Sequence, residues 1–170
     1  MVLTPHSIAG AAIASFFKLN PFTAFFAGFL SHFFLDAVPH WDYKLKSEYK
    51  DLENPMNGDL IIGRDFYFDL VKIGFDALLG LSLAVFFFNF GLGVSLEIVL
   101  AGVIGALAPD ALQFVYTKWR KEPLISLQRT HLLFINFFQK KIESPFWGLS
   151  MYCFVVVLFL FLGSLGVFSL

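Results

Sequence analysis

Four histidines and three aspartates in or beside apolar stretches carry most of the chemistry that this sequence offers. The aspartates are Asp36, Asp76 and Asp110. An aspartate at the centre of a membrane helix costs about 2.5–3.5 kcal/mol on insertion scales, so such residues tend to face a protein interior and to mark a functional site. We expect all three carboxylates to lie near one end of their helices, at a common level.

One of the apolar segments carries a regular His/Asp pattern. His32, Asp36 and His40 follow one another at intervals of four residues, which places them along one face of a helix. Pro39 removes a backbone donor and disfavours helix at the residue before it. We therefore expect the helix to end there, with His40 and Asp42 turning back over its end.

The other two histidines extend this arrangement. His6 begins the first apolar segment, and His131 begins a short run, Leu132–Phe138, that we interpret as an interfacial helix. Imidazole nitrogen and carboxylate oxygen suit zinc and also manganese or iron, and the lack of thiolates favours an open catalytic site over a closed structural one. The sequence therefore predicts one or two divalent ions, most readily zinc. The predicted ligands are His6, His32, Asp36, His40, Asp110 and His131.

Three further side chains are predicted to support catalysis. Asp76 or Asp42 would orient a ligand histidine or accept a proton, and Arg129 would hold an anionic group. Two ions about 3.5–4 Å apart, bridged by an aspartate, would generate hydroxide and clamp a phosphoryl group. Structural explanations also exist, such as a core histidine bonded to a carbonyl or an Asp76–Lys72 ion pair on one helix.

The composition indicates an integral membrane protein. Of 170 residues, 58% are hydrophobic, 19% aromatic and 15% charged, and the mean hydropathy is +0.73. Soluble domains are about 45–50% apolar and 25% charged. This difference, with a net charge of −1, excludes an ordinary water-soluble enzyme, a disordered chain and a nucleic-acid-binding domain. The single cysteine, Cys153, forms no internal disulfide, and the first residues lack the basic segment of a signal peptide.

About five apolar segments are expected to be transmembrane helices of one all-α, polytopic bundle, a single domain covering residues 1–170. Val71–Phe90 and Val94–Tyr116 form a hairpin, each arm long enough at 1.5 Å per residue to cross a hydrocarbon core of about 30 Å. His6–Phe17 and Phe22–Val38 form a shorter pair, and Phe146–Phe168 crosses once.

Most charged residues lie in two segments, about 39–70 and 117–145. Because a hairpin separates these segments, both face one compartment, which their lysines and arginines identify as the cytoplasm. The sequence thus predicts a protein of the prokaryotic cytoplasmic membrane with its N-terminus and charged loops inside. Small residues within Ile8–Ala14, or the Gly91–Gly93 turn, would allow helices of a homo-oligomer to approach closely.

Four short motifs resemble those of the membrane-bound metal-dependent hydrolases, small bacterial and archaeal membrane proteins. The motifs are Pro5–Gly10, Gly28–Asp36 with its S-H-x-x-x-D spacing, Ala108–Asp110 and Arg129–His131. The S-H-x-x-x-D element, which here precedes the P-D element and so reverses the family order, is also similar to the H-x-x-x-D ligand pair of zinc-dependent phospholipases C. The resemblance implies metal ligation by His6, His32, Asp36, Asp110 and His131.

The leading hypothesis is a membrane-bound hydrolase that uses metal-bound hydroxide to cleave a phosphoester or another anionic, lipid-linked group at the cytoplasmic face. Its partners would be membrane lipid and that substrate. A cation or proton transporter is one alternative, but its path would need polar groups across the whole bilayer, whereas those of this chain gather at one face. The other alternative is a non-catalytic membrane subunit whose mixed-charge loop, Lys44–Asp69, binds a partner.

Overall fold

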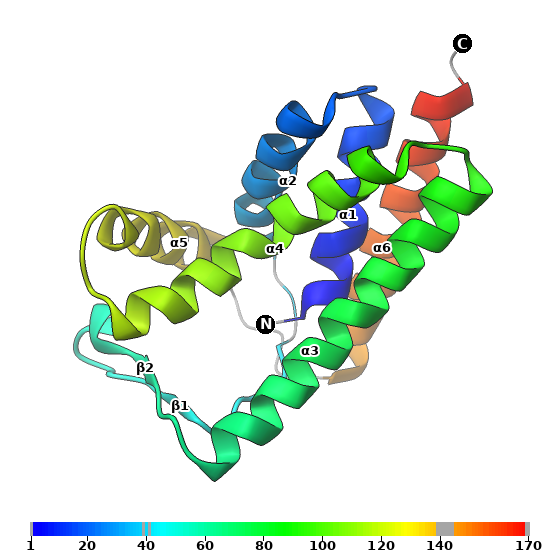
Figure 1. The fold of residues 1–170 in the computed structure, drawn as a ribbon. Helices are drawn as coiled ribbons and strands as arrows, with labels where there is room; N and C mark the ends of the chain where they lie inside the picture. The colour runs from blue at the N-terminus through cyan, green and yellow to red at the C-terminus, as the bar shows by residue number, and fades with distance from the viewer. Residues whose placement is uncertain (1, 39, 41, 139–144, 169–170) are drawn as a thin grey trace.

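The computed structural model describes residues 2–38, 40, 42–138 and 145–168, and these residues are mostly helical (Figure 1). The all-α class that the sequence predicts is therefore confirmed at this level. The helices are α1 (Leu3–Phe16), α2 (Pro21–Asp36), α3 (Arg64–Ala84), α4 (Leu96–Lys118), α5 (Leu124–Phe138) and α6 (Pro145–Phe168). Between α2 and α3, β1 (Glu48–Tyr49) pairs antiparallel with β2 (Asp59–Leu60).

The expected hairpin of two long helices is present in α3 and α4, but α3 begins at Arg64, ahead of the expected start at Val71. Its charged first turns still form helix, and the Arg64 guanidinium lies 5.7 Å from the Phe68 ring centroid. At its other end α3 continues into a π-helical segment, Val85–Gly91. The turn closes at Gly93, whose φ of +71° is a conformation that glycine adopts without strain.

The helices α1, α2 and α4 approach one another backbone to backbone. A Cβ atom built on Gly102 of α4 would lie 2.6 Å from the carbonyl oxygen of Gly10 in α1. A Cβ atom on Gly10 or on Gly28 of α2 would in turn overlap the carbonyl oxygen of Gly102. Because these positions are glycine, α4 packs most extensively against α2 and α1. The small residues of α1 are therefore used within the chain rather than left exposed for a second copy.

Two further sets of contacts complete the arrangement. α6 packs along α1, and the core between them includes Ile8, Ala12 and Phe88. The loop that carries β1 and β2 lies between the start of α3 and the end of α4 (Figure 1). It is fixed to α4 by the Tyr116 hydroxyl, which donates to the Met56 carbonyl at 2.8 Å. It is fixed to α3 by Asp69, which accepts from the backbone and hydroxyl of Ser47, both at 2.8 Å.

Within the described residues, two helices are long and apolar enough to cross a membrane: Arg64–Gly91, with 28 residues, and Leu96–Lys118, with 23. In the helix Arg64–Gly91, only 11% of an apolar stretch of 18 residues is buried inside the protein. α1 and α2 are shorter, with 14 and 16 residues. Large apolar side chains face outward on several helices, among them Phe22, Phe34, Val71, Phe75, Phe86 and Phe154.

Candidate metal centre

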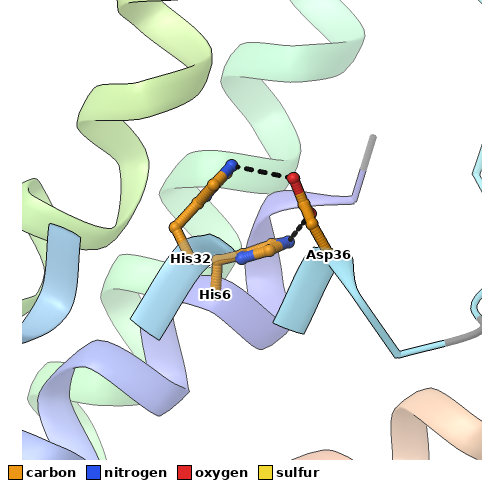
Figure 2. A group of neighbouring side chains, drawn as sticks. All are labelled: His6, His32 and Asp36. Atoms are coloured by element: carbon orange, nitrogen blue, oxygen red, sulfur yellow. Dashed lines mark ion pairs between the residues drawn. The ribbon is translucent and has the colours of Figure 1, made fainter. Parts of the chain in front are cut away.

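Five of the predicted metal ligands lie together where α1, α2, α4 and α5 meet. Their side chains are buried, with exposed fractions between 0% and 8%. The five are His6, His32, Asp36, Asp110 and His131. Figure 2 shows three of them, with the imidazoles of His6 and His32 turned toward the Asp36 carboxylate.

α2 supplies two of these ligands from adjacent turns. The helix starts where Pro21 follows Asn20, whose side chain accepts the Thr23 N–H at 3.0 Å. Since His32 and Asp36 are four residues apart in this helix, they share its inner face. The Nε2 atom of His32 lies 3.2 Å from Oδ2 of Asp36.

A backbone contact fixes the orientation of His32. Its Nδ1 lies 2.8 Å from the carbonyl oxygen of Ala106 in α4, so Nδ1 carries the proton and donates it to that oxygen. With Nδ1 engaged in this way, Nε2 faces the carboxylates, with Asp110 Oδ1 at 3.4 Å. A hydrogen bond of this kind behind the ligating nitrogen is typical of metal-binding histidines.

His6 approaches Asp36 from the opposite side. Its Nε2 lies 3.3 Å from Oδ1 of Asp36, and its ring lies against that of His32 with centroids 4.3 Å apart. His6 is one turn before Gly10 on α1, so the close contact of Gly10 with Gly102 sets how near this imidazole comes to α4.

α5 contributes His131, from a longer helix than the expected Leu132–Phe138. α5 begins at Leu124, since the Glu122 carboxylate accepts both the N–H and the hydroxyl of Ser126, at 3.1 and 2.8 Å. His131 is on its buried side, with Nε2 2.5 Å from Asp36 Oδ2.

The spacing of the atoms around His32 Nε2 matches a divalent ion. Ligand atoms about 2.0–2.1 Å from a tetrahedral zinc lie about 3.3 Å from one another. The pairs that His32 Nε2 forms with Asp36, Asp110 and His131 are 3.2, 3.4 and 3.4 Å apart. Among the described side chains, the buried polar atoms without a hydrogen-bond partner are His6 Nδ1 and Asp110 Oδ2, both in this cluster. The residues therefore fit a metal ion.

The structure places His40 and Asp42 beside each other and outside the two groups of possible ligands, His6/His32/Asp36 and His32/Asp110/His131. His40 Nδ1 lies 2.7 Å from the Val38 carbonyl, and Nε2 lies 3.4 Å from Asp42 Oδ2. Burial opposes charge on His40, but the Asp42 hydrogen bond outweighs it and raises the His40 pKa. The ligand role of His40 and the catalytic role of Asp42 stay predictions.

The remaining predicted catalytic residues also lie outside the cluster. The Asp76 carboxylate accepts the N–H groups of Leu3 and Thr4 at the start of α1. Lys72 donates to the Lys44 carbonyl at 3.0 Å and so contacts the loop before α3. Arg129 is exposed on α5, whereas His131 is buried. The catalytic roles of Asp76 and Arg129 stay predictions.

Sequence reasoning missed the residues that bring the ligands together. Gly10 follows His6 by four positions, Gly28 precedes His32 by four, and Ala106 precedes Asp110 by four. A small residue one helical turn from three of the five ligands therefore indicates close helix packing beside the site.

Comparison of the chain with protein-family models, curated proteins and solved structures finds no match. The resemblance to the membrane-bound metal-dependent hydrolases therefore depends on the short motifs alone and stays a prediction.

Proposed function

We propose that the protein is a membrane-embedded, metal-dependent hydrolase. The observation that carries this proposal is the approach of three imidazoles to one carboxylate: His6, His32 and His131 each bring Nε2 to within 2.5–3.3 Å of an Asp36 oxygen. Histidine and aspartate without thiolate are typical of open catalytic sites. These residues would hold a divalent ion, which would supply Lewis-acid chemistry for the hydrolysis of an ester.

The side chains of the cluster have distinct tasks in this proposal. His32 is held by its bond to the Ala106 carbonyl and so presents Nε2 in a fixed direction. Asp36 offers one oxygen to His6 and the other to His32 and His131. The Oδ2 atom of Asp110 has no hydrogen-bond partner among the residues that the structure describes, so it would be available to take up a proton from an attacking water.

We further propose that five of the helices lie in the membrane, with α5 at its surface. The support is the outward apolar surface, which includes Val71, Phe75 and Phe86 at 72%, 71% and 71% exposure. Apolar surface of this kind is unfavourable in water and favourable against lipid. By the charge distribution, the loops before α3 and after α4 face the cytoplasm.

The lengths of α1 and α2 bear on the substrate. With 14 and 16 residues, they are about 21 and 24 Å long, shorter than a hydrocarbon core of about 30 Å. If the turn between α1 and α2 reaches the outer surface of the membrane, the helix ends that carry His6 and Asp36 lie just beneath its inner surface. The exposed Lys44, Lys46 and Lys50 of the adjacent loop attract anionic headgroups. We therefore propose a phosphoester or similar anionic group linked to a lipid as the substrate class.

The test is metal content and hydrolysis of the full chain purified in detergent. We expect stoichiometric divalent metal by elemental analysis, and hydrolysis of bis(p-nitrophenyl) phosphate or of phospholipid in mixed micelles. His32→Ala and Asp36→Asn should abolish both. Asp65→Asn, which alters an exposed carboxylate at the start of α3, should change neither. A wild-type protein that is folded, free of metal and unable to bind added zinc would overturn the proposal.

A further inference from the structure

The metal-binding cluster divides into two unequal parts. Four donor atoms form the larger part, in which His32 Nε2 lies 3.2–3.4 Å from each of the other three. The four atoms are His32 Nε2, His131 Nε2, Asp36 Oδ2 and Asp110 Oδ1. They come from α2, α4 and α5, and they are enough to complete a tetrahedral coordination shell.

The smaller part consists of His6 Nε2 and Asp36 Oδ1, which are 3.3 Å apart. His6 is the ligand that α1 contributes, and within the described part of the chain its other ring nitrogen has no hydrogen-bond partner. Asp36 therefore belongs to both parts, because its two oxygens face different imidazoles. A carboxylate placed in this way can bridge two ions.

A single ion does not use all of these donors. His32 Nε2 can bind one ion only, and its Nδ1 is engaged by the Ala106 carbonyl. Four protein ligands from the larger part would close a tetrahedral ion to water, whereas a catalytic ion keeps at least one position open. His6 would be left beside that closed ion with its Nε2 lone pair unused.

Charge separates the two parts further. Among the described side chains, two carboxylates in the larger part balance a divalent ion, whereas the smaller part shares one of them, Asp36. An ion bound by His6 and Asp36 would keep positive charge and several open positions. An anionic oxygen of a phosphoester supplies both the charge and the ligand that this second position lacks.

We propose that the centre binds two divalent ions with unequal affinity: a tight ion held by His32, His131, Asp36 and Asp110, and a weaker, open ion held by His6 and Asp36. This inference rests on the proposed function, because it assigns the substrate-binding position to the ion at His6. The tight ion organises α2, α4 and α5, and the weak ion is the one that an anionic substrate contacts.

The experiment is a metal titration of the metal-free, full-length protein in detergent, with Zn²⁺ followed by calorimetry and with Co²⁺ followed by its visible spectrum. We expect two equivalents, with affinities at least an order of magnitude apart. The first equivalent of Co²⁺ should give the intense bands of tetrahedral coordination, and the second the weak bands of higher coordination. Added inorganic phosphate should tighten only the second.

Two variants assign the positions. His6→Ala should keep the first equivalent with its affinity and spectrum and lose the second, together with hydrolysis. His131→Ala should lose the tight equivalent. Because retention of the first equivalent is itself a measure of folding, a loss of binding by misfolding in His6→Ala is recognised at once, and His6→Gln then serves as a milder substitute.

The outcomes separate this inference from the proposed function. A single equivalent in the wild type, with His6→Ala lowering its affinity, would show that His6 binds the same ion and would overturn the two-ion centre while leaving a metal-dependent hydrolase. Two equivalents that both survive in His6→Ala and His6→Gln would also overturn it. No metal binding in the wild type would remove both proposals.

Discussion

The Asp76 carboxylate caps the first turn of α1, with Oδ1 2.6 Å from the hydroxyl oxygen of Thr4. The same carboxylate accepts the backbone N–H groups of Leu3 and Thr4, and Val2 at the cap position provides no side-chain acceptor of its own. A negative charge at a helix N-terminus satisfies its unpaired donors and interacts favourably with its dipole. α3 thereby holds α1 two residues before the candidate ligand His6.

Replacing Asp76 tests this contact. We expect Asp76→Ala to lower the free energy of unfolding by roughly 1–3 kcal/mol, because it leaves partly buried N–H groups at the start of α1 without an acceptor. Asp76→Asn retains an acceptor without the charge, so its loss should be smaller. Thermal unfolding in detergent measures both, with Glu53→Gln, at an exposed acidic residue of the loop before α3, as the control. An Asp76→Ala protein as stable as the wild type would contradict the capping role.

The glycine contact between α1 and α4 gives a second prediction. Gly102→Ala places a methyl group against the Gly10 carbonyl, so we expect a loss of about 1–3 kcal/mol from overpacking. It should also reduce metal content, because α1 moves and carries His6 with it. The control is Gly74→Ala in α3, where a Cβ meets nothing within 4 Å and the helix should gain about 0.5–1 kcal/mol. If Gly102→Ala and Gly74→Ala had the same stability and metal content, the close contact between Gly102 and Gly10 would be contradicted.

The His40–Asp42 pair predicts a pH dependence. The His40 hydrogen bond lowers the pKa of Asp42 to about 2 against the opposing effect of burial. The ionised Asp42 therefore stabilises the fold at a pH above its unfolded pKa of 3.8, and this stabilisation is lost as the pH falls toward 2. The protonated His40, whose pKa is raised by folding, stabilises the fold fully at a pH below its unfolded pKa of 6.5. This stabilisation is lost as the pH rises through the folded pKa.

NMR titration of the imidazole signals checks this expectation. His40 should still be protonated at pH 6.5, and Asp42→Asn should lower its pKa, because the variant removes the charge that Nε2 faces. A His40 pKa below 6.5 in the wild type, or one that Asp42→Asn leaves unchanged, would show that His40 and Asp42 do not pair.

The proposed topology is testable with single cysteines. In a Cys153→Ser background, cysteine at Glu53 in the loop before α3 should react with an impermeant maleimide only from the cytoplasmic side. Cysteine at Lys18, in the turn between α1 and α2, should react only from the opposite side. Both residues are exposed, so a failure to label reports the membrane rather than burial. Labelling of both from one side would refute the α1–α2 hairpin as a crossing pair.

The sequence was most informative where chemistry and helix periodicity coincide. His32 and Asp36, four residues apart in an apolar run, were placed correctly on one inner face because helix geometry alone fixes that relation. His6, Asp110 and His131 were also expected in the cluster, since polar groups in apolar surroundings must meet one another. All five meet in the structure.

The sequence was least informative where one residue type has several uses. An aspartate in an apolar helix satisfies a metal ion, a lysine or a helix N-terminus equally well, and only the neighbour in space decided that Asp76 caps α1. The start of α3 was missed because its first turns are charged and hydropathy alone marked only the later, apolar part. The start of α5 was also missed, because hydrogen bonds from Ser126 to the Glu122 carboxylate, rather than hydropathy, fix where this helix begins.

The distribution of the ligands along the chain has a consequence for biosynthesis. His131 lies 95 positions after Asp36 and 99 after His32, so α5 is the last ligand-bearing segment to leave the ribosome. A nascent chain that ends before α5 contains Asp36, Asp110 and two of the three clustered imidazoles, but not the one closest to Asp36. Completion of the cluster is therefore a late step in maturation, after the α3–α4 hairpin has been synthesised.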